Sequence, residues 1–344
     1  MHARTVRIIW SIGRRVVGRL PPRVAEAARA FVRSRSRARR DRGKPAARYP
    51  KTVRVGRWQA IDRPWPEPPP IDRPFGLISE PPPDPPIAYD VTLFESLNAE
   101  YASHPIVRTT PAYDAASMTE RSRRRLDGIH SHLGLAGMTT LEVGCGAGYE
   151  VWYLGNHFGS DAWGIDIAPR RAWSSLQGDR VHLVEGDLAG DHGLPVAAFD
   201  RVLSFTVWEH ITRPREALVE LFRVMKPGGL ATIRANLYRG PTASHRSARI
   251  HFPFPHLLFQ DDVIAEAMRR AGQPAIGAAW VNRLTWEQYE AYLLEIGFVI
   301  RALSFDRYPL DEDFYRRFED VLGRYPRIDL ERGFFTVVLE RPGL

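Results

Sequence analysis

The feature that most constrains the fold is a glycine-rich turn between residues 141 and 150, which read LEVGCGAGYE. A short apolar run meets glycines at alternate positions, and a helix-compatible segment follows from Tyr149 to Phe158. Glycine lets the backbone turn sharply and approach a ligand without a Cβ in the way. The pattern therefore predicts a strand, a tight turn and a helix start, the ligand-binding corner of an α/β fold. Its G-x-G-x-G spacing differs from the G-x-G-x-x-G fingerprint of dinucleotide-binding folds.

Acidic residues follow the next two predicted strands. Asp166 ends a strand over Ala162–Asp166, and Asp187 follows a strand over Val181–Val184. A carboxylate at the end of the second strand of a nucleotide-binding fold accepts hydrogen bonds from ribose hydroxyls. The alternative for each residue is a helix N-cap, a position at which Asp is favoured.

Further elements alternate as an α/β fold requires. The sequence predicts four more strands, over Phe199–Phe205, Leu230–Ile233, Phe298–Phe305 and Phe334–Glu340. It also predicts helices over Thr92–Tyr101, Ala112–Leu133, Pro214–Lys226, Asp261–Ala271, Thr285–Glu295 and Glu312–Leu322. The helix from Pro214 opens with proline, which suits a first turn, and is expected to stop at Pro227-Gly228-Gly229.

In this order and spacing, the motifs between Leu126 and Leu237 resemble the class I S-adenosylmethionine-dependent methyltransferases, in particular the methyltransferase type 11 group. The resemblance implies an α/β fold, a Rossmann-like seven-stranded, mostly parallel sheet with helices on both faces. It also implies an enzyme that takes its methyl group from S-adenosyl-L-methionine (SAM).

The resemblance places the cofactor against residues at four strand ends, which are Glu142, Gly144, Gly146, Gly148, Asp166, Ile167, Asp187, Leu188 and Thr206. The three glycines let the backbone close around the methionine part of SAM. Glu142 is expected to orient their loop by hydrogen bonds.

The other residues of this set divide the rest of the cofactor between them. Asp166 is expected to hold the ribose, with Ile167 against the adenine. Asp187 would accept a hydrogen bond from the adenine amino group, while Leu188 packs near the ring. Thr206 would lie near the transferred methyl.

Methyl transfer from a sulfonium is an in-line displacement that needs alignment and exclusion of water. A base matters only when the acceptor is a hydroxyl or another weakly acidic group. His210, in a Glu209-His210 pair after the fourth strand, is a candidate base because histidine titrates near neutrality. His251 is a second candidate and His245 a rival. We expect no metal, because His245, His251 and His256 match no zinc-ligand spacing.

Charge and proline content divide the chain into three parts. Residues 1–48 carry a net charge of +13, and the remainder carries −5. This basic, amphipathic arm suits contact with an anionic membrane, but a docked helix, a transit peptide or a mobile arm also fits. Residues 49–86 form a proline-rich linker. The methyltransferase domain is expected over residues 87–344, with insertions at 236–283 and 308–332 that form a substrate lid.

We therefore predict a cytoplasmic methyltransferase, peripheral at a membrane if the arm binds lipid, that acts on a small-molecule or lipid-linked acceptor. O-methylation is favoured slightly over N- or C-methylation. A single cysteine, Cys145, excludes a disulfide framework, and no apolar run reaches the ~20 residues that span a bilayer. The negative balance of the domain disfavours nucleic acid. The alternatives are a nicotinamide-dependent oxidoreductase and a catalytically degenerate, membrane-associated scaffold.

Overall fold

The computed structural model describes residues 53–55, 89–107, 112–190, 192–275, 278 and 281–343. The predicted basic arm over residues 1–48 lies outside the described residues. The predicted linker over residues 49–86 does too, apart from the short strand Val53–Val55. Among the helices of the described ranges, none combines the length and apolarity needed to span a membrane.

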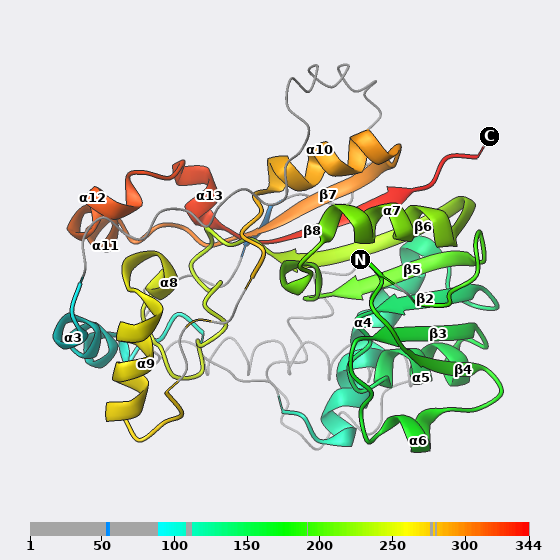
Figure 1. The fold of residues 1–344 in the computed structure, drawn as a ribbon, viewed down its shortest axis with the longest axis horizontal. Helices are drawn as coiled ribbons and strands as arrows, with labels where there is room; N and C mark the ends of the chain where they lie inside the picture. The colour runs from blue at the N-terminus through cyan, green and yellow to red at the C-terminus, as the bar shows by residue number, and fades with distance from the viewer. Residues whose placement is uncertain are drawn as a thin grey trace, which may run out of the picture. The chain divides into compact units, whose positions relative to one another are not determined.

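A mixed sheet organises the described domain (Figure 1). Its strands follow the order β1-β7-β8-β6-β5-β2-β3-β4. Their bounds are β1 Val53–Val55, β2 Thr139–Val143, β3 Asp161–Asp166, β4 Val181–Glu185, β5 Phe199–Phe205, β6 Met225–Asn236, β7 Val299–Arg307 and β8 Arg332–Glu340. The seven-stranded, mostly parallel sheet is confirmed. The neighbours β4, β3, β2, β5 and β6 pair in parallel in this order, and β8 pairs antiparallel to both β6 and β7. The short β1 adds an antiparallel strand at the β7 edge.

Helices cover both faces of the sheet, as expected. On one face α7 (Pro214–Val224) and α10 (Trp286–Ile296) pack over an apolar core that includes Val202 of β5. On the other face α4 (Ala115–Leu133) and α5 (Tyr149–His157) cover a core that includes Leu203. Val202 and Leu203 are neighbours in β5 but belong to cores on opposite faces, because side chains alternate along a strand.

The junction of α7 and β6 differs from the prediction. The helix ends at Val224, and β6 already begins at Met225, so the expected Pro227-Gly228-Gly229 stop lies inside the strand. The register of β6 against β5 shifts there, and Gly228 N donates to Arg341 O at 2.7 Å while Arg341 N donates to Gly229 O at 3.0 Å. This pairing with the chain beyond β8 satisfies backbone groups that a free turn would expose to water.

The two predicted insertions meet in a third apolar cluster, beyond the carboxyl end of β5 (Figure 1). Its helices are α3 (Val91–Tyr101), α8 (Pro255–Leu258), α9 (Asp261–Arg270), α11 (Glu312–Arg317), α12 (Glu319–Leu322) and α13 (Arg327–Glu331). Phe94 of α3 packs edge-on against Phe252 and Phe259 of the first insertion, each with ring centroids 5.1 Å away. These aromatic residues therefore fill a core. The predicted helix over Glu312–Leu322 is broken at the buried Phe318, whose φ is −126°.

Gly164, in the middle of β3, sets how closely α5 approaches the sheet. A Cβ at this position would lie 2.6 Å from Val151 Cγ2 and 2.9 Å from Cys145 Sγ. We expect Gly164→Ala to lower the free energy of unfolding by about 1–3 kcal/mol, the usual cost of overpacking a core.

Gly178→Ala is the matched control, because a Cβ there meets nothing within 4 Å. It should change the stability by no more than about 0.5 kcal/mol. Urea unfolding of both variants measures the contrast, and equal stabilities would contradict the close packing at Gly164.

Candidate functional site

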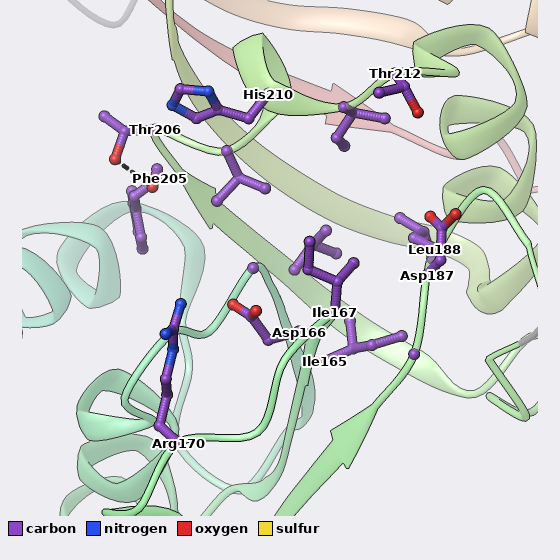
Figure 2. A pocket seen from close by; sticks show the side chains of 15 residues that line it. Ile165, Asp166, Ile167, Arg170, Asp187, Leu188, Phe205, Thr206, His210 and Thr212 are labelled. Atoms are coloured by element: carbon purple, nitrogen blue, oxygen red, sulfur yellow. Dashed lines mark hydrogen bonds between the residues drawn. The ribbon is translucent and has the colours of Figure 1, made fainter. Parts of the chain in front are cut away.

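A cavity of about 540 Å³ opens at the carboxyl ends of β2, β3, β4 and β5 (Figure 2). Its size is typical of small-molecule sites. It lies where β2 pairs with β3 on one side and with β5 on the other, the kind of switch point at which α/β sheets bind ligands. The lining residues are Val143, Gly144, Ile165, Asp166, Ile167, Arg170, Gly186, Asp187, Leu188, Phe205, Thr206, Val207, His210, Ile211 and Thr212.

Most of the residues singled out in the sequence line this cavity, namely Gly144, Asp166, Ile167, Asp187, Leu188, Thr206 and His210. Glu142, Gly146 and Gly148 belong to the same turn but are not among the lining residues, and neither is His251. The cofactor contacts of all these residues remain predictions. Arg170, four residues after Asp166, lines the cavity and was not singled out.

The glycine turn has the backbone geometry that the sequence implies. Gly144 has a φ of +71°, and a Cβ there would lie 2.2 Å from Val207 Cγ2, across the cavity edge on the β5 side. Gly148 has a φ of +85°, and a Cβ would meet Leu183 of β4 at 2.9 Å. Position 144 therefore requires glycine because the turn lies so close to Val207. Position 148 requires it because Leu183 packs against the end of the turn.

Asp166 connects the end of β3 to the glycine turn. Its Oδ2 accepts a hydrogen bond from Gly146 N at 2.8 Å, and its Oδ1 accepts one from Ala168 N at 3.2 Å. The carboxylate also lines the cavity, between Thr206 and Asp187 (Figure 2). Each carboxylate oxygen has two acceptor sites, so these backbone bonds leave capacity for a ligand hydroxyl.

Asp187 is less available than Asp166. Its Oδ2 lies 3.0 Å from Arg213 Nη2 in an exposed ion pair, and its Oδ1 accepts a hydrogen bond from Ala189 N at 2.9 Å. The bond to Ala189 closes a turn, and no helix begins at Asp187, so the helix-capping alternative for Asp187 is not what the structure has. Nearby, Ile167 exposes 74% of its surface at the cavity, while Leu188 is 4% exposed. An exposed isoleucine beside a carboxylate offers an apolar surface on which a flat ring can pack.

Glu142 lies buried behind the turn. Burial raises its pKa well above the ordinary value, and the charges of Glu150 and Asp166 add to the rise while Arg125 opposes it. Its Oε2 has no hydrogen-bond partner among the described residues. This oxygen therefore accepts no hydrogen bond from the loop, and the orienting role of Glu142 stays a prediction. Backbone bonds to Ile165 O from Gly144 N and Cys145 N, at 2.8 and 3.1 Å, hold the loop instead.

Cys145 is buried at the centre of the turn, as expected for a packing residue. Burial, together with the charges of Glu142 and Asp166, raises the pKa of its thiol. A thiol that stays protonated is a poor nucleophile.

The other end of the cavity carries Thr206 and His210 (Figure 2). Thr206 has a φ of +57°, and its N–H donates to Arg234 O of β6 at 2.7 Å. Its Oγ1 donates to Phe205 O at 2.6 Å. His210 ends the short 3-10 helix η3 (Trp208–His210) and is exposed.

Glu209, His210 and His245 form a cluster whose candidate ligand atoms all lie within 4.8 Å of one another. The rings of His210 and His245 meet edge-on, with centroids 4.7 Å apart. Burial raises the pKa of Glu209 to about 7. Burial, His210 and Arg246 lower the pKa of His245 to about 4. The sequence pointed to each histidine separately, and only the fold brings them together.

His251 lies apart from this cluster and outside the lining of the cavity. Its backbone N–H donates to Asn98 Oδ1 at 2.8 Å, and its carbonyl accepts from Ile106 N at 2.9 Å. Its backbone therefore ties the first insertion to α3 and the chain that follows it. A catalytic role for His251 has no support in this geometry.

Asn282, near the end of the first insertion, holds η3 in place. Its Nδ2 donates to Trp208 O at 2.6 Å, and its backbone N–H donates to Glu209 O at 2.7 Å. Tyr289 of α10 donates its hydroxyl to the same Trp208 carbonyl at 3.1 Å. These buried bonds fix the turn that carries Glu209 and His210.

Comparison with known families agrees with this geometry. Residues 141–233 match the family described as a methyltransferase domain. The matched segment contains the glycine turn, Asp166, Asp187 and His210. This segment is a methyltransferase domain.

Two curated relatives of this methyltransferase domain are O-methyltransferases by name. A probable chloroplastic tocopherol O-methyltransferase of Oryza sativa subsp. japonica is 30% identical over 173 residues, which cover 46% of this chain and 47% of the relative. A ubiquinone biosynthesis O-methyltransferase of Azoarcus sp. (strain BH72) is 32% identical over 128 residues, covering 35% of this chain and 53% of the relative. The chain thus spans about half the length of the curated relatives it matches.

Solved methyltransferase structures align with this chain as well. An S-adenosylmethionine-dependent methyltransferase from Mesorhizobium loti aligns at 18% identity with a TM-score of 0.41, covering 60% of this chain and 92% of that chain.

The raised pKa of Glu142 predicts a pH-dependent cost to stability. A carboxyl whose pKa is higher in the folded state contributes stability at low pH and loses it as the pH rises above about 4.5, its ordinary value. Glu142→Gln keeps the shape without the titration. Its melting temperature should therefore exceed that of the wild type by more at pH 8 than at pH 5.

Glu120→Gln on the exposed face of α4 is the control, because Arg123 lowers the pKa of Glu120. It should show no such rise with pH. A constant or shrinking difference for Glu142→Gln would mean that Glu142 is charged in the folded protein.

The contacts of Asn282 predict a second stability effect. Asn282→Ala removes a buried donor to Trp208 O and should cost about 1–3 kcal/mol of unfolding free energy. Tyr289→Phe removes the weaker bond to the same carbonyl and should cost about 0.5–1.5 kcal/mol. Denaturant unfolding measures both, and a loss no larger for Asn282→Ala than for Tyr289→Phe would contradict the assigned role.

Proposed function

We propose that the chain is a SAM-dependent methyltransferase that methylates a hydroxyl of a small-molecule or lipid-linked acceptor. The observation that carries the proposal is the placement of Asp166, whose carboxylate both fixes the glycine turn and lines a cavity within the methyltransferase domain. In α/β folds such a carboxylate binds ribose hydroxyls.

The cavity suits SAM in several independent ways. Gly144 has no side chain, so the turn can lie directly against Val207 at the edge of the cavity. Ile167 presents exposed apolar surface for the adenine, and Asp166 keeps acceptor capacity for the ribose. The methionine part would then lie along the glycine turn, with its sulfonium toward Thr206 and His210. SAM supplies the activated methyl group, and the protein's task is to hold the acceptor in line with it and exclude water.

The preference for a hydroxyl acceptor has two supports. The curated relatives described above are named as O-methyltransferases of tocopherol and of ubiquinone biosynthesis. A hydroxyl also needs help in losing its proton, and Glu209, His210 and His245 gather polar groups at the methyl end of the cavity. A nicotinamide cofactor is disfavoured by the G-x-G-x-G spacing of the turn.

Ligand binding tests the cofactor assignment directly. SAM, or its demethylated product, at 100 times its dissociation constant should raise the unfolding free energy by ~2.7 kcal/mol. A melting shift of several degrees should follow, and NAD or NADP should give none. The absence of a shift with either sulfur ligand, in protein shown to be folded, would refute the assignment.

Asp166→Asn tests the residue that carries the proposal. Charge-assisted hydrogen bonds contribute ~1.5–3 kcal/mol, so SAM affinity measured by calorimetry should fall about tenfold or more. Asp161→Asn, at the opposite end of β3 and paired with the exposed His182, is the matched control and should leave the affinity unchanged. Equal affinities for both variants would mean that Asp166 serves the turn alone.

A further inference from the structure

Glu209 is a buried carboxylate that pairs with no side chain of the described residues. Its residue surface is 2% exposed, and neither Oε1 nor Oε2 makes a hydrogen bond of good geometry among the described residues. The backbone N–H groups of Glu209 and Asn236 only partly oppose the rise in pKa that burial causes. Within the same cluster, the buried Nε2 of His245 also lacks a partner among those residues. Unsatisfied buried polar groups in one cluster are costly unless something binds to them.

Two other buried carboxylates of the described residues are paired with arginine, whereas Oε2 of Glu142 has no partner there. Glu150 receives Arg125 at 2.6 Å, and Asp329 receives Arg239 at 2.6 Å. Arg234, whose charge also acts on Glu209, is instead bonded to Asp306 at 2.5 Å. Of the two buried acids with unpaired oxygens, Glu209 is the one that belongs to a cluster with two histidines.

We propose that Glu209, His210 and His245 bind a divalent transition-metal ion, with zinc as the best fit, beside the methyl end of the cavity. Two imidazoles and one carboxylate are a donor set that holds zinc and leaves further positions open for a substrate oxygen. The three residues come from two segments, η3 and the first insertion. This is why their spacing in the sequence resembles no zinc motif.

The geometry needs only a small adjustment to close around an ion. The candidate ligand atoms lie within 4.8 Å of one another. Two ligands of a tetrahedral zinc ion with bonds of ~2.1 Å lie ~3.4 Å apart, so shifts below ~1 Å by each side chain suffice. Asn282 braces the carbonyls of Trp208 and Glu209, at 2.6 and 2.7 Å, and so keeps two of the three ligands on a fixed turn.

The ion would activate the acceptor, a role that rests on the proposed function. His210 lines the cavity, so an open position of the ion can face the acceptor hydroxyl. A divalent ion lowers the pKa of an oxygen bound to it, and the proton leaves to water. The oxygen then attacks the methyl carbon, forming a C–O bond as the C–S bond breaks. The electron pair of that bond leaves sulfur as a neutral thioether.

Metal binding is measured on the tag-free full-length chain after removal of metal with a chelator. Co²⁺ is titrated without SAM, and its visible absorption reports the ligands, followed by displacement with Zn²⁺ and measurement of bound zinc. We expect one ion per chain. Glu209→Gln and His245→Asn should each weaken binding at least tenfold. Asn tolerates the φ of +55° found at His245, which makes it the substitution least harmful to the backbone.

His251→Asn is the matched control, because this histidine belongs to the same insertion and lies outside the cluster. It should bind metal like the wild type, and melting curves verify that every variant is folded. No stoichiometric binding, or binding retained in both cluster variants, would overturn the site and leave Glu209 as a protonated, unpaired carboxyl. SAM binding is measured separately. A chain that binds metal without binding SAM would keep the site and lose only its role in methyl transfer.

Discussion

The cavity depends on the hydrogen bond from Gly146 N–H to the carboxylate of Asp166, which together with two backbone bonds to Ile165 O joins the turn after β2 to the end of β3. This bond holds the turn after β2 against the end of β3, in the positive-φ geometry that only glycine adopts at low cost. The turn then presents Gly144 close to Val207, after β5. One carboxylate thus shapes the backbone and also offers an acceptor to the cavity. Structural and ligand-binding roles of Asp166 are not alternatives.

The electrostatics of the two cavity ends differ for a physical reason. Near the predicted adenine end, Asp187 is exposed and paired with Arg213, so water and an ion pair moderate its charge. At the other end Glu209 is buried, and burial raises its pKa to about 7. The charge of the Glu209 carboxyl depends strongly on what binds beside it, because little solvent screens that charge. Binding should therefore change the charge more at the end where methyl transfer would occur than at the predicted adenine end.

Local sequence patterns predicted the parts of the structure that local chemistry controls. The glycine turn, the carboxylates at the ends of β3 and β4, and the seven main strands follow from short-range spacing. The break at Phe318 and the early start of β6 at Met225 arise from tertiary contacts, which override local helix signals. The cluster of Glu209, His210 and His245 could not be predicted for the same reason, since His245 meets the Glu209-His210 pair only in the folded chain.

The apolar cluster beyond the sheet has a consequence for how this protein could be re-engineered. Residues of α3, of the first insertion and of the second insertion bury one another there, with Phe94, Phe252 and Phe318 among the most enclosed. Neither insertion has a complete core of its own. Grafting one of them onto a related scaffold would expose a contiguous apolar face and invite aggregation. The smallest transferable unit is the pair of insertions together with α3, exchanged as one block.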